Sequence, residues 1–177
     1  LGWNHALQYA VKEANRRGVP LVILFTLVPV FPEASLGHYR FMLEGLLELK
    51  RQLFLQGTRF ILRTGSPSAI VSELGSEAAV VVTDRDYLKH QQRWREEVAR
   101  ELLCQFTEIE SNVVVPVEAA SRKEEWSAAT FRRKVVPLLD NFLDDPGRDW
   151  PEVSSLSLDL DGGTGRMDDL LAGLTPE

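Results

Sequence analysis

Apolar runs and helical apolar stripes alternate along the first two thirds of the chain. Continuous β-branched and apolar runs are typical of strands that are covered on both faces, as parallel strands are. These runs are VPLVILFTLV (19–28), RFILRT (59–64) and AAVVVTD (78–84), and FTEIES (106–111) alternates like an edge strand. Between the runs, apolar residues recur every three or four positions, which predicts helices. The helical stripes are Leu7–Ala14, Tyr39–Leu53, the segment after Ser66, and Trp94–Leu102.

Helix start and stop signals lie between these elements. The first helix is followed by RRG (16–18) and the second by Gly57, which suits helix carboxyl ends. Ser66 is placed to cap the third helix, with Pro67 at its first position. Regular alternation of this kind predicts a Rossmann-like, doubly wound α/β fold, with a parallel sheet and helices on both faces.

The beginning of the pattern is unusual for such a fold. The chain opens directly in a helix, whereas a doubly wound sheet normally starts with its central strand. We therefore expect the first strand to lie upstream of Leu1 in a longer parent protein.

Charge divides the chain into two parts. The net charge is −6, but residues 144–177 carry nine acidic side chains and two arginines, so residues 1–143 sum to +1. The acidic part is rich in Pro, Gly, Ser and Asp, as expected of a linker that packs only in places, with one short helix near Met167–Leu174. The sequence predicts a domain at 1–143 and a loosely held acidic linker at 144–177.

Composition excludes several function classes. Cys104 is the only cysteine, so the chain has no internal disulfide and no cysteine metal cluster. Its three histidines do not have the spacing of a metal motif, and a nucleophile elbow of the Gly-x-Ser-x-Gly type does not occur. The longest apolar run is interrupted by proline and too short to cross a bilayer, so we expect a soluble, cytoplasmic protein.

In a parallel sheet of this kind, ligands bind outside the carboxyl ends of the strands. Those ends are Thr26–Phe31, Thr64–Ser66 and Thr83–Asp86, and we expect the main pocket around Leu27, Thr64 and Asp84. The turn TGSPS (64–68) could hold an anion with its backbone N–H groups, although plain helix capping explains it better. Asp84 and Asp86 are compatible with a metal or a ribose, or with solvated strand ends. These patterns indicate a small-ligand-binding α/β domain.

Five separated motifs add a family resemblance. They are WNHALQYA (3–10), VPLVILFTLVPVF (19–31), HYRFMLEGLLELKRQL (38–53), VVTDRDYLKHQQRWREEVA (81–99) and VVPVEAASRKEEWSAATFRRKV (114–135). Their order and spacing resemble the amino-terminal domain of class II cyclobutane pyrimidine dimer photolyases, over roughly residues 4–143. Two motifs depart from the family: WNHAL stands where Asp-Asn-Trp-Ala-Leu is usual, and TDRDYLK replaces a Pro-Leu-Arg ending.

The resemblance implies a light-driven repair enzyme. In that family, reduced FAD in a carboxyl-terminal helical domain injects an electron into a pyrimidine dimer in DNA, and the dimer splits. The parent is then a deoxyribodipyrimidine photo-lyase, a carbon–carbon lyase, and the α/β domain alone is not expected to repair DNA. The expected partners are that helical domain and, through it, ultraviolet-damaged DNA, with residues 144–177 as the interdomain linker.

The resemblance also implies an antenna chromophore, a deazaflavin or a folate, near the interface between the two domains. The candidate antenna pocket comprises Leu27, Pro29, His38, Tyr39, Thr64, Gly65 and Asp84. Two alternatives stay open. One is a stand-alone nucleotide-binding protein of the universal stress or electron-transfer flavoprotein type, and the other is a photolyase-like structural domain without an antenna.

The basic segment 116–134 is the candidate interdomain surface. Helical spacing separates two sets of side chains there, and we expect Trp126, Phe131 and Val135 to face the α/β core. The other set is basic and faces outward: Arg122, Lys123, Arg132, Arg133 and Lys134. Trp126, Arg132, Arg133 and Lys134 are the predicted interdomain residues. A solvated basic surface is the alternative, and a direct DNA-phosphate patch is less favoured because glutamates lie among the basic groups. Pro137 is expected to interrupt the helical run.

Overall fold

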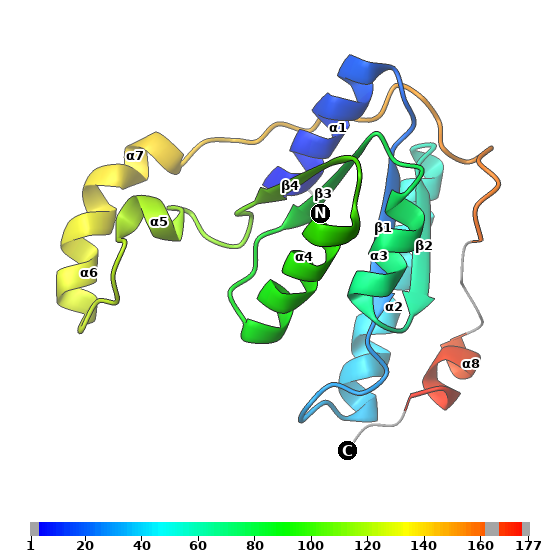
Figure 1. Cartoon of the computed structure of the whole chain (residues 1–177), viewed down its shortest axis with the longest axis horizontal. Helices are drawn as coiled ribbons and strands as arrows, with labels where there is room; N and C mark the ends of the chain where they lie inside the picture. Colours follow the sequence, from blue (N-terminus) through cyan, green and yellow to red (C-terminus); the bar gives the residue numbers. More distant parts are fainter. Residues whose placement is uncertain (1–3, 162–166, 175–177) are drawn as a thin grey trace.

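The computed structural model describes residues 4–161 and 167–174, and Figure 1 shows how their helices and strands are arranged. The first eight elements alternate as predicted. They are α1 (His5–Arg17), β1 (Val22–Leu27), α2 (Leu36–Leu55), β2 (Arg59–Thr64), α3 (Pro67–Gly75), β3 (Val80–Asp84), α4 (Lys89–Glu101) and β4 (Gln105–Ile109). Short helical pieces follow: α5 (Val117–Ala120), α6 (Ala128–Val135), the 3₁₀ turn η1 (Val136–Leu138), α7 (Leu139–Phe142) and α8 (Met167–Ala172). Within the described residues, none of the helices is long and apolar enough to cross a membrane.

Capping residues fix where the first helices begin. The Asn4 side-chain oxygen accepts a hydrogen bond from the Leu7 N–H at 2.6 Å, and α1 ends at Gly18, whose φ of 62° is left-handed. Ser35 and His38 form a reciprocal capping box at the start of α2. Ser66 is the N-cap of α3 as predicted, but its hydroxyl makes no capping bond. These local signals explain why the helix boundaries follow from the sequence.

The four strands form two parallel pairs. β1 pairs with β2 in a register that sets Leu27 opposite Thr64, and β3 pairs with β4 in a register that sets Asp84 opposite Ile109. The parallel α/β class is therefore confirmed. Within the described residues, β1 and β3 are not hydrogen-bonded to each other.

Helices lie on both sides of the strands. α2 packs on β2, and α1 packs on β3 and β4. α3 packs against α4 and β1, and Figure 1 places α3 and α4 in front of the strands and α2 behind them. The main core lies between β1, β2 and α2. Its buried side chains are Leu27, Tyr39, Leu43, Leu53, Phe60, Leu62 and Leu174.

The acidic tail is tied to the domain along its path over α1. The backbone N–H groups of Asp149 and Glu152 donate to the side-chain oxygens of Gln8 and Asn15, each at 2.9 Å. The Asn15 amide also donates to the carbonyl oxygen of Trp150 at 3.0 Å. Hydrogen bonds to backbone groups therefore fix this stretch.

A second tie joins the tail to the first residue of β2. The Arg59 guanidinium donates to the carbonyl oxygens of Leu156 at 2.8 Å and Leu160 at 3.1 Å. The Arg59 backbone N–H donates to the Ser155 hydroxyl at 2.7 Å, and Ser155 is 0% exposed. Further on, α8 packs on α2, which confirms the short helix predicted near Met167–Leu174. The prediction of a loosely held tail was wrong because it considered only charge attraction.

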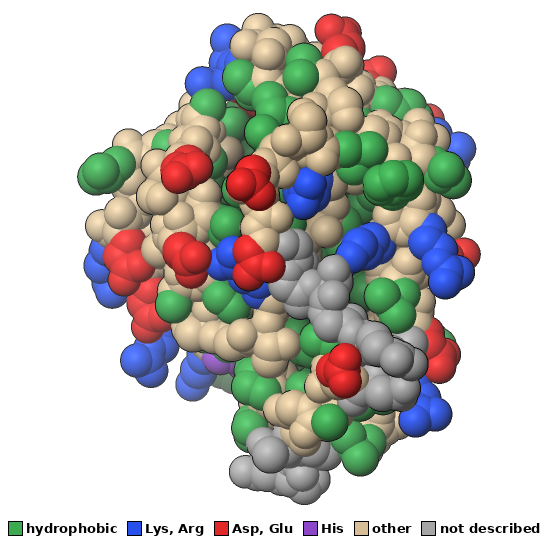
Figure 2. All heavy atoms as spheres, turned by 90° about the vertical axis from the view of Figure 1, so that its right-hand side faces the viewer, with side chains coloured by type: hydrophobic (Ala, Val, Ile, Leu, Met, Phe, Trp, Pro, Cys, Tyr) green, Lys and Arg blue, Asp and Glu red, His purple; other side chains and the backbone are tan. Residues whose placement is uncertain are grey.

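The tail's later part and the basic segment lie at opposite sides of the molecule. In Figure 1, α5, α6 and α7 stand to one side of the strands and α8 lies at the other. Figure 2 shows the face on the α8 side, where acidic side chains are scattered among basic and apolar ones. The tail's later part therefore does not cover the basic segment.

The segment from α5 to α7, residues 117–142, is named the arm. Trp126 is 99% exposed, Phe131 is exposed, and α6 has no buried residue. The expectation that Trp126 and Phe131 face the α/β core was wrong, because the arm stands away from the strands instead of lying on them (Figure 1). The interruption by Pro137 is confirmed, since Pro137 lies in the 3₁₀ turn η1 between α6 and α7.

Candidate functional site

The carboxyl ends of β1 and β2 lie side by side. The Gly65 N–H donates to the Leu27 carbonyl oxygen at 3.0 Å, which extends the pairing beyond the strands. Gly65 has a φ of 146° and a Cβ there would lie 3.3 Å from Ile70, so glycine suits this turn. Leu27 is only 1% exposed, whereas Thr64 is exposed. This corner brings three predicted residues together, and Thr64 and Gly65 are its accessible part.

The loop after β1 is fixed by the start of α2. The Tyr39 hydroxyl donates to the Val28 carbonyl oxygen at 2.9 Å, and Tyr39 is 4% exposed. His38 is exposed, and its ring nitrogen accepts the Ser35 N–H at 3.1 Å. Pro29 directly follows Val28 in this loop and is half-buried. Tyr39 is therefore a core residue that anchors the loop, and His38 caps a helix.

The carboxylates after β3 have protein partners. Asp84 accepts a hydrogen bond from the Asn4 side-chain amide at 3.1 Å. Asp86 accepts from Asn112 at 2.7 Å and from Gln91 at 3.0 Å. Within the described residues, no group of three or more His, Cys, Asp or Glu side chains is arranged to hold a metal ion. Asp84 and Asp86 thus connect neighbouring loops, and Asp84 lies on the other strand pair from Leu27 and Thr64.

An aromatic row joins the two strand pairs at this edge. The Phe31 ring, in the loop after β1, lies 5.3 Å from the His90 ring of α4 in an edge-to-face arrangement. His90 in turn lies 4.9 Å from Trp94, one turn further along the helix. The buried Nε2 atom of His90 has no hydrogen-bond partner among the residues that the structure describes. The spacing of His90 and Trp94 along α4 was the only sequence signal for this row, and it did not point to Phe31.

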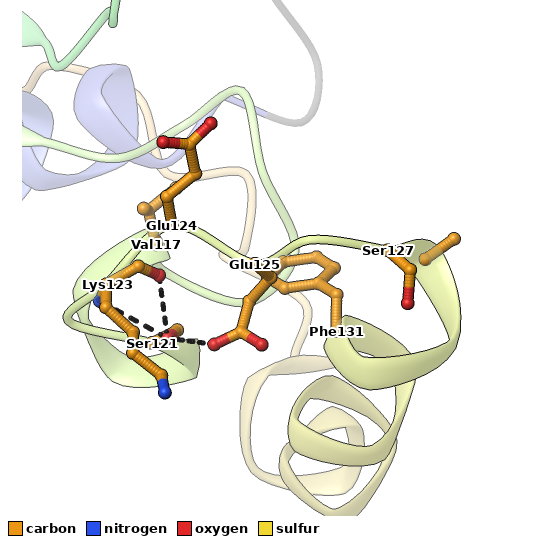
Figure 3. A pocket seen from close by; sticks show the side chains of 8 residues that line it. Val117, Ser121, Lys123, Glu124, Glu125, Ser127 and Phe131 are labelled. Carbon is orange, nitrogen blue, oxygen red and sulfur yellow. Dashed lines mark hydrogen bonds between the residues drawn. The ribbon is translucent and has the colours of Figure 1, made fainter.

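Two surface hollows lie away from the predicted pocket. One, of about 390 Å³, is in the arm between α5 and α6 (Figure 3). The other, of about 540 Å³, is lined by His5, residues 111–114 after β4, and residues 142–145. Leu27, Thr64 and Asp84 line neither of these two hollows. Leu27 is sealed in the core and Asp84 is paired with Asn4, and the pocket expected around them stays a prediction.

A hydrogen-bonded cluster stabilises the hollow in the arm. The Lys134 ammonium donates to the Glu125 carboxylate at 2.5 Å and to the Ser121 hydroxyl at 3.1 Å. Ser121 also donates to Glu125 at 2.7 Å, and Figure 3 shows the Glu125 carboxylate directed toward it. The hydrogen bonds from Lys134 and Ser121 lower the pKa of Glu125. Lys134 thus holds the arm together, which distinguishes it from the exposed Arg132 and Arg133.

The comparisons with known proteins bear on the whole of this α/β unit. Residues 1–152 match the protein family described as DNA photolyase. The chain belongs to the DNA photolyase family. A photolyase relative named deoxyribodipyrimidine photo-lyase, from Methanothermobacter thermautotrophicus, is 43% identical over 141 residues, which cover 80% of this chain and 32% of the relative. A photolyase of the same name from Potorous tridactylus is 33% identical over 144 residues, with 79% and 27% covered.

A solved photolyase shares the fold. The archaeal photolyase from Sulfolobus tokodaii aligns with a TM-score of 0.69 and 21% identity, over 97% of this chain and 38% of its own. That structure is described as containing two FAD molecules, with the implication of a novel light-harvesting cofactor. The chain therefore spans about a third of the length of these photolyases.

Proposed function

We propose that this chain is the amino-terminal α/β domain of a class II cyclobutane pyrimidine dimer photolyase. The observation that carries the proposal is the 43% identity over 141 residues to a deoxyribodipyrimidine photo-lyase, about three times as long as the matched part. Five separated motifs that resemble class II enzymes support the finer assignment. The repair activity then belongs to a longer protein, of which this chain is the supporting domain.

The proposed roles of the α/β domain and of the helical domain follow from the residues that this chain contains. Reduced FAD, excited by light, supplies the electron that splits the dimer, and it is proposed to sit in a carboxyl-terminal helical domain outside this chain. The present residues would hold that domain in place and position an antenna chromophore. The damaged DNA would be contacted through the helical domain.

The arm is the proposed interdomain surface. Trp126 is 99% exposed. The exposed Phe131 and Val117 line the hollow drawn in Figure 3. Large apolar side chains on a surface, rimmed by charged groups, mark places where another protein surface docks. The exposed Arg132 and Arg133 directly follow Phe131 in α6 and are the proposed charged rim, and the cluster of Lys134, Glu125 and Ser121 keeps the arm in shape. A helical domain of the same protein is the proposed occupant.

The antenna residues fit a chromophore in part. Thr64 is exposed, Gly65 has no side chain to obstruct a flat ring, and Pro29 is half-buried at the same corner. Leu27 and Tyr39 are closed in the core and can only support that corner. The second FAD of the Sulfolobus tokodaii photolyase supports an antenna in this family. We propose Pro29, His38, Thr64 and Gly65 as the contact surface.

The interdomain proposal can be tested by replacing the exposed arginines of the arm and keeping Lys134, which is bonded within the arm. The double variant Arg132→Ser with Arg133→Ser is made in the full-length protein and in the 177-residue chain. A matched control replaces Arg93 and Arg100 with serine in the same way. Their side chains are exposed on α4, with relative exposures of 80% and 71%.

We expect the arm variant to lower light-driven repair several-fold in the full-length protein and to leave the urea unfolding midpoint of the chain unchanged. The control should change neither quantity. Unchanged repair in the arm variant would contradict the docking role, whereas a lower midpoint of the chain would mean that these arginines stabilise the α/β domain itself.

The antenna proposal needs a separate measurement. The full-length protein is purified from a host that produces deazaflavin, and its absorption is compared with that of a Thr64→Trp variant, whose bulk would fill the corner. A chromophore band that is lost in the variant is the expected result. Absence of any band besides that of FAD would favour the alternative of a structural domain without an antenna.

A further inference from the structure

The chain crosses twice between the α/β unit and the arm, and these two crossings are named the neck. Residues 113–116 lead from β4 into α5, and residues 143–148 lead from α7 back toward α1, as Figure 1 shows. The hollow of about 540 Å³ borders on both crossings, because residues 111–114 and 142–145 line it. Val115 is buried and secures the position of the outgoing crossing. The loosely filled neck leaves the direction of the arm to other contacts.

Beyond α5, the arm is held together by its own contacts. Within the part of the chain that the structure describes, the side-chain hydrogen bonds of residues 121–142 all join residues of the arm, as in the cluster of Lys134, Glu125 and Ser121. α6 packs against α5 and η1, and it has no buried residue. The arm is thus a small body of its own, and its direction is set where α5 meets the strand ends.

Two hydrogen bonds tie α5 to the ends of β3 and β4. The Arg85 guanidinium, directly after β3, donates to the Glu118 carboxylate at 2.5 Å. The Val117 N–H, at the first residue of α5, donates to the Glu110 carboxylate directly after β4 at 3.4 Å. The bond from Arg85 is the shorter, and both of its partners are charged, which makes it the stronger tie.

Arg85 is itself held by the strands. Its backbone N–H donates to the Ile109 carbonyl oxygen at 2.8 Å, which extends the pairing beyond β3. Its guanidinium lies 3.9 Å from the Glu108 carboxylate. Glu108 in turn accepts a hydrogen bond from Arg95 of α4 at 3.1 Å, and the Arg95 side chain is only 11% exposed. A row of alternating charges thus runs from α4 past both strand ends to α5, and Arg85 carries it across to the arm.

We propose that Arg85 is the positioning residue of the arm, and that its bond to Glu118 sets the direction in which the exposed Trp126 and Phe131 point. The inference rests on the proposed docking of a helical domain on the arm. It gives a role to TDRDYLK (83–89), the motif that contains Arg85 and departs from the family pattern. The side chains of Arg85 and Glu118 are 34% and 69% exposed. Salt therefore weakens this pair, and it can open without disturbing the strands.

Distances between two spin labels measure the direction of the arm in the 177-residue chain. One label is attached through Ala129→Cys on α6 and the other through Glu101→Cys at the end of α4, and both positions are exposed. Cys104→Ser removes the only native cysteine. With Arg85 and Glu118 intact, we expect one narrow distribution of distances. Raising the salt concentration from about 0.05 to about 0.5 M should widen it, because salt screens the exposed pair.

Variants of the pair identify the bond that is responsible. Arg85→Met and Glu118→Ala should each widen the distribution roughly two-fold, because a segment held by fewer contacts fluctuates more. The double variant should widen it no further, since both changes remove the same bond. Arg85→Lys keeps the charge and should restore part of the narrow distribution. Arg93→Met, which removes an exposed ion pair with Glu97 inside α4, is the matched control and should change nothing.

Light-driven repair by the full-length protein completes the test. Arg85→Met and Glu118→Ala should each lower repair several-fold, Arg85→Lys should lower it less, and the double variant should be no worse than either. An unchanged distance distribution in both single variants would overturn the inference. A change in only one of them would also overturn it, because Arg85 and Glu118 would then not act as a pair.

The repair assay also separates this inference from the docking on which it rests. If the arm docks the helical domain but Arg85 does not position it, the double variant Arg132→Ser with Arg133→Ser lowers repair and Arg85→Met does not. If the arm is not a docking surface, neither variant lowers repair, even where Arg85→Met widens the distance distribution. Both results would overturn the positioning role, and only the second would overturn the proposed docking.

Discussion

Arg59→Met should release the acidic tail from β2. The substitution keeps an unbranched apolar stem and removes the three guanidinium hydrogen bonds to the carbonyl oxygens of Leu156, Leu160 and Ser155, at 2.8, 3.1 and 3.4 Å. Hydrogen bonds from a charged group contribute about 1.5–3 kcal/mol net. Arg59 is half-buried, and the backbone bond to Ser155 survives the substitution. We therefore expect a loss of about 2 kcal/mol in the free energy of tail docking, which raises the undocked fraction roughly 30-fold.

Native-state proteolysis measures that fraction. When opening and closing are fast, the cleavage rate follows the population of the open form. Thermolysin cleavage around Leu156–Leu160 should be roughly 30-fold faster in Arg59→Met than in the unaltered chain. Arg51→Met, on the exposed side of α2, is the matched control and should cleave at the unaltered rate. Cleavage of Arg59→Met within two-fold of that control would refute the reasoning.

Three further predictions concern the packing and the electrostatics of the domain. A Cβ on Gly75 would lie 2.6 Å from Leu102, so Gly75→Ala should cost about 1–3 kcal/mol in urea unfolding. Gly45→Ala, with open space around it, should instead stabilise α2 by about 0.5–1 kcal/mol. Hydrogen bonds from Arg16 and, to a smaller extent, from Arg17 lower the pKa of Glu13 to about 2. Because the pKa of Glu13 is lower in the folded than in the unfolded state, the unaltered chain is more stable than its Glu13→Gln variant above pH 4.5. Acid unfolding curves should show this difference in stability vanish as the pH falls through 2.

The helix and strand boundaries could be predicted because local chemistry determines them. Asn4 and Gly18 delimit α1, and Pro67 starts α3, each through a backbone preference that is encoded at that position. The apolar runs likewise identified β1 and β3. Which strands pair is a property of the whole sheet, and the pattern alone could not show that β1 pairs with β2 and β3 with β4 in the described residues.

The tail and the arm could not be predicted from charge and spacing. Ser155 and Arg59 are joined by bonds to backbone groups, which leave no signature in composition. Helical spacing does not say whether the apolar side of α6 meets the core or another domain, and it placed Lys134 on the outward basic side although Lys134 is bonded to Glu125 within the arm. The exposed Trp126 shows that the arm's apolar side is not used by this domain.

The central claim is tested most directly by measuring light-driven repair of a thymine-dimer oligonucleotide. The full-length protein with reduced FAD is compared with the 177-residue chain supplied with the same FAD, each under near-ultraviolet or blue light and in the dark. The account predicts dimer loss only for the full-length protein in the light. Repair by the 177-residue chain alone, or no light-dependent repair by the FAD-loaded full-length protein, would contradict it.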